Sequence, residues 1–409
     1  MYSRRVVITG MGAVSPFGAG VESMWDGLVA GDSAVGELPS GTEISGLSVR
    51  AAGMVPPVNV KVIPRQYRRS MSRMTQYAVL AAQEALTQAN ISDAVLASGR
   101  LGVCVGSTIG SADALEEFFT EYVKENSLEA IRSTTFFKVM GHTVAANLAQ
   151  VLGVTGRVEA PSAACASGCQ AIGLAYESIA YGRQDVMLCG GADEFSPLTA
   201  ATFGLMNAAS SSDVTSPEAS SRPFDSSRDG IVCAEGAGLL IVESLEHAQA
   251  RGANILAEIV GFACNSSPSS IANPDANSIK TCIELALKDA SVSPADVDYI
   301  SAHATGTEQG DIAEATAIAE IFTSMPMISS LKGHMGHTMA ASGALESIAS
   351  VLMITNDIIV PTRNLTEVDP RCGAVNLPVV NHNQAVSTVV KNSFALGGIN
   401  SVLVIRNAT

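Results

Sequence analysis

Cys165 opens a stretch whose residue types suit a reactive thiol. No charged residue follows it until Glu177, and residues 163–173 are mostly small or apolar, which predicts a buried helix with room beside it for a long substrate arm. A thiol in the first turn of a helix faces unpaired backbone N–H groups and the positive end of the helix dipole, which favour the thiolate. We therefore interpret Cys165 as a nucleophile. The competing interpretation is a buried structural cysteine, as most free cysteines are.

Three later segments favour the catalytic interpretation. Each places histidine, lysine or paired glycines just after a β-like run, where α/β folds collect their active-site loops. The segments are residues 301–311 with His303, residues 329–337 with Lys332 and His337, and residues 392–400 with Gly397 and Gly398.

With Cys165, these segments resemble the β-ketoacyl-acyl carrier protein synthases, the elongating condensing enzymes of the thiolase superfamily. The resemblance extends over nearly the whole chain and includes residues 5–12, 190–194 and 221–230. It implies a decarboxylative Claisen condensation. An acyl chain stored as a thioester on Cys165 is extended by malonyl-acyl carrier protein, in type II polyketide or fatty acid biosynthesis. The chain is thus expected to be an acyltransferase.

The resemblance also implies roles for particular residues. His303 and His337, as neutral imidazoles, would bind the oxygen of the enolate formed on decarboxylation. The backbone N–H groups of Cys165 and Leu396 would form an oxyanion hole, because the Gly397-Gly398 turn brings that strand beside the thiol.

Four further residues match the family's supporting positions. Lys332 would order the site electrostatically, and Glu346 would be the buried carboxylate paired with it. Thr305 and Thr307 would hydrogen-bond the phosphopantetheine arm of the carrier. Asp311 and Glu314 are interpreted as first-turn carboxylates of a helix.

The elements that must position these residues alternate between β-like and helical runs, which indicates an α/β fold. We expect strands at 6–10, 101–106, 186–189, 238–243, 255–262 and 299–303, and helices at 75–88, 141–152 and 277–290. The rhythm restarts after residue 250. This predicts an N-terminal half, residues 1–250, with the nucleophile and a C-terminal half, residues 251–409, with the histidines; the resemblance implies the duplicated five-layer αβαβα thiolase-like fold.

Composition excludes several classes of function. A net charge of −15 disfavours nucleic-acid binding, and no apolar run reaches the ~20 residues that a membrane span needs. The eight cysteines are irregularly spaced, without a C-x-x-C pair, so we expect no metal site and a cytoplasmic location. Gly10-Met11-Gly12 lacks the third glycine of a dinucleotide-binding loop. No cofactor bound by the chain itself is expected, since the substrates arrive on carrier phosphopantetheine.

One segment runs against the acidic balance. Residues 59–83 contain no acidic residue and carry five cations, namely Lys61, Arg65, Arg68, Arg69 and Arg73. Family members dock the acidic carrier protein on a basic patch in this region, at the mouth of the acyl tunnel. We interpret Lys61, Arg65, Arg68 and Arg69 as the docking site, and the alternative is a merely solvated basic turn.

The chain departs from the family pattern in the turn that carries Leu396. Housekeeping synthases have a phenylalanine here that separates the acyl pocket from the malonyl site, and leucine is smaller. This favours a type II polyketide or aryl-polyene ketosynthase. Such enzymes act as homodimers or pair with a chain-length-factor-like subunit, and the resemblance puts the interface at Phe136-Phe137 and residues 141–152.

Two other functions of thiolase-like proteins fit the sequence less well. A thiolase acting on coenzyme A esters would need a second catalytic cysteine late in the chain, and Cys372 does not lie in such a motif. A non-catalytic chain-length factor would lack the nucleophile that Cys165 supplies.

Overall fold

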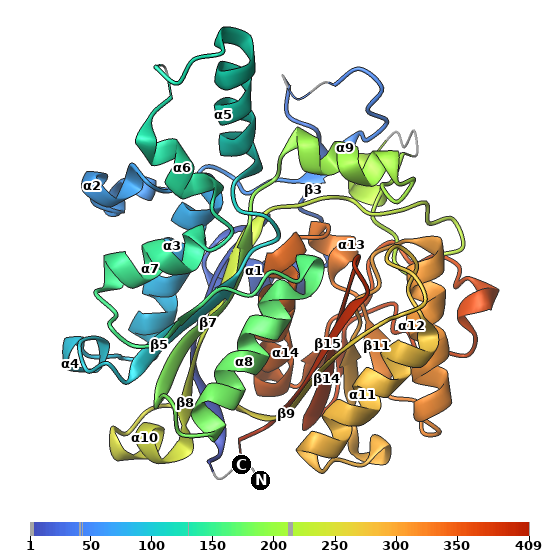
Figure 1. Cartoon of the computed structure of the whole chain (residues 1–409). Coiled ribbons are helices and arrows are strands. Elements are labelled where there is room, and N and C mark those ends of the chain that lie inside the picture. The colour runs from blue at the N-terminus through green and yellow to red at the C-terminus, as the bar shows by residue number, and fades with distance from the viewer. Residues whose placement is uncertain (1–3, 41, 43, 130, 212–215, 409) are drawn as a thin grey trace.

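The computed structural model of the chain describes residues 4–40, 42, 44–129, 131–211 and 216–408. Layers of helices alternate with two halves of a continuous β-sheet (Figure 1). The halves join at β1 (Val6–Ser15), which pairs antiparallel with β8 (Gly236–Ser244) on one side and with β9 (Ala257–Ser266) on the other. The chain passes from the first half to the second between α10 (Leu245–Ala250) and β9.

The two halves repeat one pattern of strand pairing. Along β1-β8-β7-β5-β6 the pairings are antiparallel twice and then parallel twice, and the order β9-β15-β14-β10-β11 has the same succession. This agrees with the duplication expected from the sequence. The strands not yet located are β5 (Leu101–Gly106), β6 (Val158–Glu159), β7 (Val186–Asp193), β10 (Tyr299–Ser301), β11 (Met327–Ser329), β14 (Thr388–Ala395) and β15 (Ile399–Arg406).

Helices complete the five layers. The central layer is α8 (Ser167–Ala180) and α14 (Ser342–Asn356), which contact both halves of the sheet; α3 (Arg73–Gln88) and α7 (Thr143–Leu152) cover the first half, and α11 (Ala276–Ala290) with α12 (Glu308–Ile321) covers the second. The central helices pack closely because glycines stand at their contact. A Cβ at Gly168 would lie 2.3 Å from the Ala340 carbonyl oxygen, and a Cβ at Gly343 would lie 2.4 Å from the Cys169 nitrogen, so a larger residue would not fit at either position. The predicted αβαβα fold is confirmed.

The glycines near the N-terminus have a packing role. β1 runs on to Ser15, beyond the predicted end at residue 10, and a Cβ at Gly10 or Gly12 would lie 2.2 or 1.9 Å from carbonyl oxygens of α3. These glycines let the helix lie directly against the strand.

Shorter elements surround these layers. They are α1 (Val21–Ala30), α2 (Arg65–Arg68), α4 (Asp93–Leu96), α5 (Ala112–Glu125), α6 (Ser133–Val139), α9 (Pro197–Leu205), α13 (Lys332–Met335), β2 (Gly18–Ala19), β3 (Val35–Glu37), β4 (Ala51–Gly53), β12 (Ile358–Ile359) and β13 (His382–Asn383). Within the described residues, the helices are too short or too polar to cross a bilayer.

Candidate active site

Cys165 lies in a tight turn that leads into the central helix α8. The turn is a 3₁₀ helix, Ala164–Ala166, and α8 begins only at Ser167, so the prediction that Cys165 belongs to the first α-helical turn is wrong by two residues. Ala164 has φ 45°, in the left-handed region that alanine rarely adopts. Ser167 fixes the turn, because its hydroxyl accepts from the Ala163 N–H at 2.8 Å and donates to the Ala164 carbonyl at 2.6 Å. Such local strain is typical of functional turns.

His303 and His337 reach Cys165 from the second half of the chain. His303 follows β10 and His337 follows α13, and the Cys165 sulfur and one ring nitrogen of each histidine all lie within 4.8 Å of one another. The two imidazole centroids are 5.3 Å apart, and the rings are nearly perpendicular at 83°. The fold thus brings together residues up to 172 positions apart, as 337 minus 165 gives.

Each imidazole keeps a nitrogen without a hydrogen-bond partner among the described residues. His337 pairs through Nδ1 with the Ser342 hydroxyl at 2.9 Å, which leaves its Nε2 unpartnered. Nδ1 of His303 is also buried and unpartnered. Buried polar atoms are rarely left unsatisfied, so these nitrogens are suited to contact substrate or to carry a proton.

Glu314 holds the turn that carries His303, a role the sequence analysis missed. Its carboxylate accepts from the backbone N–H groups of His303 and Ala304 at 2.9 and 2.7 Å, and from the side chain of Asn392 at 2.9 Å. This turn also explains why β10 ends at Ser301, two residues before the predicted end. The interpretation as a first-turn carboxylate is wrong for Glu314, which lies beyond the first turn of α12, whereas Asp311 does lie in that turn; both are buried.

The expected pair of Lys332 and Glu346 forms inside the protein. Lys332 Nζ lies 2.5 Å from Glu346 Oε1, and both side chains are at most 1% exposed. Glu346 Oε2 has a second cation beside it, Lys391, at 2.8 Å. Lys391 was not among the residues singled out from the sequence.

Burial decides the charge states of the reacting groups. It raises the pKa of Cys165 to about 12, with the Lys332 charge opposing the shift, so the expectation of a resting thiolate is wrong and the thiol is protonated. Burial also lowers the pKa of His303 and His337 well below its usual range, and the Lys332 charge acts in the same direction. Both imidazoles are therefore neutral at pH 7, as the proposed enolate binding requires.

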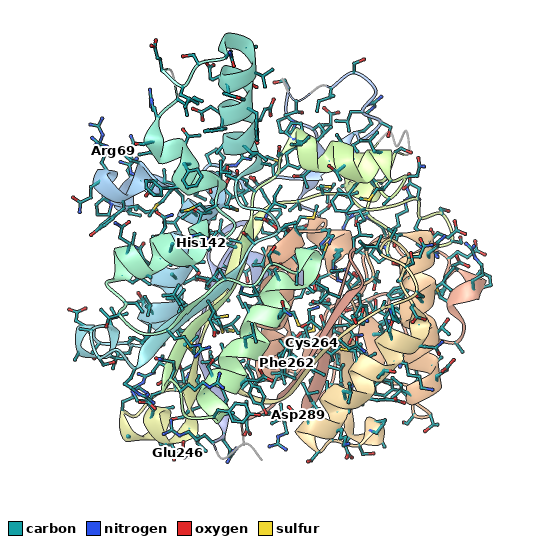
Figure 2. The ribbon with its side chains drawn as sticks, viewed as in Figure 1. Arg69, His142, Glu246, Phe262, Cys264 and Asp289 are labelled. Carbon is teal, nitrogen blue, oxygen red and sulfur yellow. The ribbon has the colours of Figure 1, made fainter. Side chains whose placement is uncertain are left out.

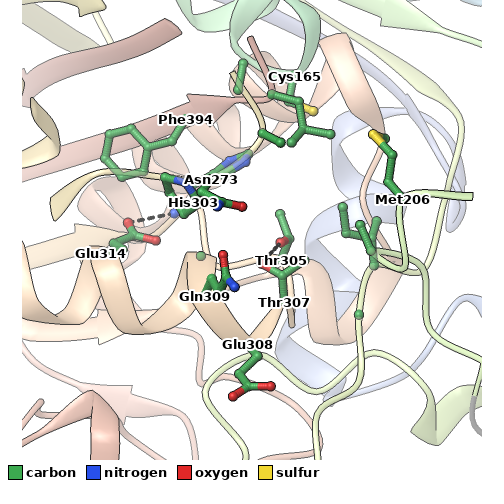
Figure 3. Close-up of a pocket in the computed structure, with 18 of the residues that line it drawn as sticks. Cys165, Met206, Asn273, His303, Thr305, Thr307, Glu308, Gln309, Glu314 and Phe394 are labelled. Carbon is green, nitrogen blue, oxygen red and sulfur yellow. Dashed lines mark hydrogen bonds between the residues drawn. The ribbon is translucent and has the colours of Figure 1, made fainter. Parts of the chain in front are cut away.

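A cavity of about 420 Å³ gives access to these three residues. Figure 3 shows Cys165 and His303 on one side of it, with Thr305, Thr307 and Met206 further along its wall. The hydroxyls of Thr305 and Thr307 lie 3.2 Å apart. Phe394 stacks edge-on against His303, with ring centroids 6.0 Å apart. The cavity thus combines apolar walls with a few polar groups, as ligand pockets do.

Leu396 lies at the turn between β14 and β15 and lines the same cavity. It is half-buried and packs against the apolar cluster that includes Cys165, Phe203 and Met339. The turn depends on glycine, since Gly397 and Gly398 have φ values of 99° and 75°.

The basic segment lies away from this cavity within one chain, so the expectation that it stands at the mouth of the acyl tunnel is not met within a single chain. Lys61, Arg65 and Arg69 are exposed, and Arg68 is half-buried, donating to the Ile63 carbonyl at 2.9 Å. Figure 1 has α2 at its left edge, whereas α9 and α12, which carry residues lining the cavity, lie on the right; Figure 2 labels Arg69 at the same left edge.

Arg73 is half-buried, with 40% of its side chain exposed, and its guanidinium is engaged by other parts of the protein. Its guanidinium turns inward, donates to the Phe195 carbonyl at 2.6 Å and lies 3.2 Å from Glu235. The exposed set is therefore smaller than the charge run in the sequence.

Comparison with known proteins places the chain in a family. Residues 3–248 match the β-ketoacyl synthase N-terminal domain and residues 256–366 match its C-terminal domain. The chain is 35% identical over 405 residues to 3-oxoacyl-[acyl-carrier-protein] synthase 1 of Haemophilus influenzae, covering 98% of this chain and 99% of that protein. It is 36% identical over 406 residues to nodulation protein E of Rhizobium meliloti, with the same coverage.

Solved structures agree. A β-ketoacyl synthase from Burkholderia phymatum superposes with a TM-score of 0.96 at 40% identity, covering 100% of both chains. A type II polyketide ketosynthase, solved with its acyl carrier protein and bound to the hexaketide, has a TM-score of 0.91 at 35% identity, covering 99% of this chain and 100% of that one. The chain belongs to the β-ketoacyl synthase family. Within it, the chain is a condensing acyltransferase of the 3-oxoacyl-[acyl-carrier-protein] synthase type, as the sequence predicted.

Proposed function

We propose that Cys165, His303 and His337 carry out the two half-reactions of carrier-dependent chain extension. The observation that carries this proposal is the approach of their reactive atoms to within 4.8 Å of one another at a cavity. A nucleophile, two proton carriers and room for an acyl chain meet at this cavity.

In the first half-reaction, Cys165 attacks the thioester carbonyl of the acyl-carrier. The thiol proton passes to a neutral imidazole and then to the departing phosphopantetheine sulfur, so the C–S bond to the carrier breaks as the bond to Cys165 forms. The backbone N–H groups of Cys165 and Leu396 stabilise the oxyanion. Because the resting thiol is protonated, this relay is necessary.

In the second half-reaction, malonyl-carrier loses carbon dioxide. The electrons of the broken C–C bond form an enolate, whose oxygen accepts hydrogen bonds from His303 and His337. The enolate carbon attacks the acyl group on Cys165, giving β-ketoacyl-carrier and the free cysteine. Lys332 supplies positive charge behind the imidazoles, and Glu346 fixes its position. Thr305 and Thr307 hold the phosphopantetheine arm, which their place along the cavity wall supports.

Leu396 sets which acyl chains are accepted. A leucine leaves more room than phenylalanine at the junction of the acyl and malonyl compartments, which favours bulky or unsaturated chains and hence a polyketide-type pathway. A similar ketosynthase/chain-length-factor structure, from the ishigamide system, has a TM-score of 0.92 at 33% identity and supports this assignment.

Leu396→Phe is expected to narrow the product range toward shorter or saturated acyl groups, because the ring fills part of the cavity while the backbone N–H stays in place. Product distributions across a panel of acyl-carriers, resolved by mass spectrometry, measure this. Leu205→Phe, at a position that is 86% exposed, is the control. Coincident profiles for wild type and Leu396→Phe would mean that this position does not select the chain.

We also propose two partners, which exposed side chains support. The acidic carrier protein docks on Lys61, Arg65, Arg68 and Arg69, and because these residues lie away from the cavity of their own chain, the carrier bound there serves the cavity of an adjoining subunit. That ketosynthase-like subunit, either a second copy or a chain-length factor, covers apolar side chains of α5 and α6. Phe119, Phe136 and Phe137 support this interface, because they are 51%, 58% and 47% exposed. Native mass spectrometry distinguishes a homodimer from a heterodimer.

We propose a cytoplasmic location for the protein. The free cysteines among the described residues suit that reducing compartment.

Arg65→Glu with Arg69→Glu is expected to raise the KM for acyl-carrier about tenfold and to weaken its salt dependence, because exposed charge pairs steer association. A short acyl-pantetheine thioester, which lacks the protein, should be used equally well by wild type and variant. Lys280→Glu with Lys288→Glu on α11 matches the charge change away from the docking surface. Equal KM effects on both substrates would show that the arginines act otherwise.

The alternatives find less support. Cys372 lies in a 3₁₀ turn, Pro370–Cys372, buried in the apolar core of the second half and absent from the cavity wall, so it does not provide a thiolase's second cysteine. A non-catalytic chain-length factor does not transfer acyl groups, so the cysteine beside two neutral imidazoles favours a catalytic subunit.

A further inference from the structure

Lys391 is a fully buried cation. It lies on the buried strand β14 (Thr388–Ala395), next to Ser301 on β10 and Leu403 on β15, and its side chain is 0% exposed. Burying an ammonium group costs several kcal/mol unless it is paired, so a lysine inside the sheet requires a compensating partner.

That partner is the carboxylate already paired with Lys332. Glu346 lies between two ammonium groups, with Oε1 2.5 Å from Lys332 and Oε2 2.8 Å from Lys391. Lys391 also donates to the carbonyl of Asn392 and, at 3.3 Å, to the hydroxyl of Ser393. Glu346 Oε1 accepts a hydrogen bond from Lys332, whereas Oε2 has no hydrogen-bond partner among the described residues and meets Lys391 only as an ion pair.

Within the trio of Lys332, Lys391 and Glu346, positive charge exceeds negative charge, and Glu314 is a further carboxylate that acts on Lys332. Lys332 and Lys391 together outnumber Glu346 by one, and burial denies them screening by water. The charges of both lysines lower the pKa of His303 and His337. The other titratable groups facing this cluster, from every element packed against it, are Cys165, Cys169, Asp193, Tyr299 and Glu314.

We propose that Lys391 is a positioning residue of the condensation: it prevents Glu346 from neutralising Lys332 and so maintains a net positive charge behind the two imidazoles. The inference rests on the proposed roles of Cys165, His303 and His337. When Lys391 is present, Glu346 positions Lys332 without neutralising the total charge of the trio. The remaining positive charge stabilises a negative enolate and keeps the histidines neutral. Without Lys391, the charges of Lys332 and Glu346 sum to zero, and the positive potential at the two imidazoles is lost.

The test separates charge from shape by combining two substitutions. Lys391→Met removes one buried cation and keeps a side chain of similar length. Adding Glu346→Gln removes the anion too and restores the original excess of one positive charge. Lys280→Met, which breaks an exposed pair with Glu320, is the matched control. Carbon dioxide release from malonyl-carrier is measured from pH 5 to pH 9, thermal unfolding checks the fold, and intact mass follows acylation of Cys165.

The expected direction of the pH shift follows from the pKa of the two histidines. Lys391 lowers the pKa of His303 and His337, so removal of Lys391 raises both pKa values. The imidazoles then become protonated, and inactive, at a higher pH than in the wild type. The acid limb of the pH profile should move up by about one pH unit in Lys391→Met, the effect of a unit charge at ~10 Å in a dielectric of ~20. It should return to the wild-type position in the double variant and stay unchanged in Lys280→Met.

An unshifted limb in Lys391→Met, or a shift that persists in the double variant, would overturn the proposal and leave Lys391 a packing residue. If the single variant does not fold, the double variant decides alone. Because Glu346 also positions Lys332, the rate itself is expected to fall and only the position of the acid limb is compared: a limb at the wild-type pH supports the charge balance, and a displaced limb contradicts it. Failure of the proposed function is separate, because wild-type protein would then form no acyl-Cys165 at all.

Discussion

Cys165→Ala is expected to leave no acyl-enzyme, while the protein stays folded. The sulfur is the atom that bonds the acyl chain, and no other side chain at the cavity offers an equivalent nucleophile among the described residues. The substitution removes a single buried atom and should cost on the order of 1 kcal/mol of stability. Intact mass after incubation with acyl-carrier measures the adduct, and thermal unfolding measures the fold.

Cys169→Ala provides the matched control, because Cys169 lies one turn further along α8. It is also fully buried, but its sulfur accepts from the Ser401 hydroxyl at 3.3 Å and it does not line the cavity. Acylation should persist in Cys169→Ala. A mass increase on folded Cys165→Ala would assign the nucleophile elsewhere.

His303→Ala and His337→Ala are each expected to slow malonyl decarboxylation at least ~10²-fold, because each removes a donor to the enolate oxygen. Acylation of Cys165 should fall much less, about tenfold, since the remaining imidazole still relays the thiol proton. Carbon dioxide release and single-turnover acylation, measured on the same preparations, separate the two effects.

The pH dependence of the wild-type enzyme tests the same assignment. Burial lowers the pKa of both histidines, so the neutral forms persist and decarboxylation should continue below the usual pKa range of histidine. His142→Ala, at an exposed histidine before α7, is the control for loss of an imidazole. Wild-type rates of carbon dioxide release in both active-site variants would refute the division of roles.

The sequence by itself determined the fold class and singled out the residues that we propose to react. Alternating β-like and helical runs predicted the α/β architecture, and most strand and helix bounds lie within a few residues of those expected, because these signals are local. Cys165, His303 and His337 were recognised because each stands in a short stretch of distinctive composition. Glycine pairs and small residues marked the turns for the same reason.

Tertiary structure decided the electrostatics and the environment of each group. Burial raises the pKa of the Cys165 thiol, because desolvation outweighs the opposing charge of Lys332. Nothing in the sequence distinguishes Glu314 and Lys391 from exposed charged residues, yet both are buried in the folded protein. Arg73 belongs to the basic segment of the sequence, but in the structure its guanidinium pairs with Glu235. Which charges meet, and how much water remains between them, depends on contacts between residues far apart in the chain. Local sequence patterns carry no such information.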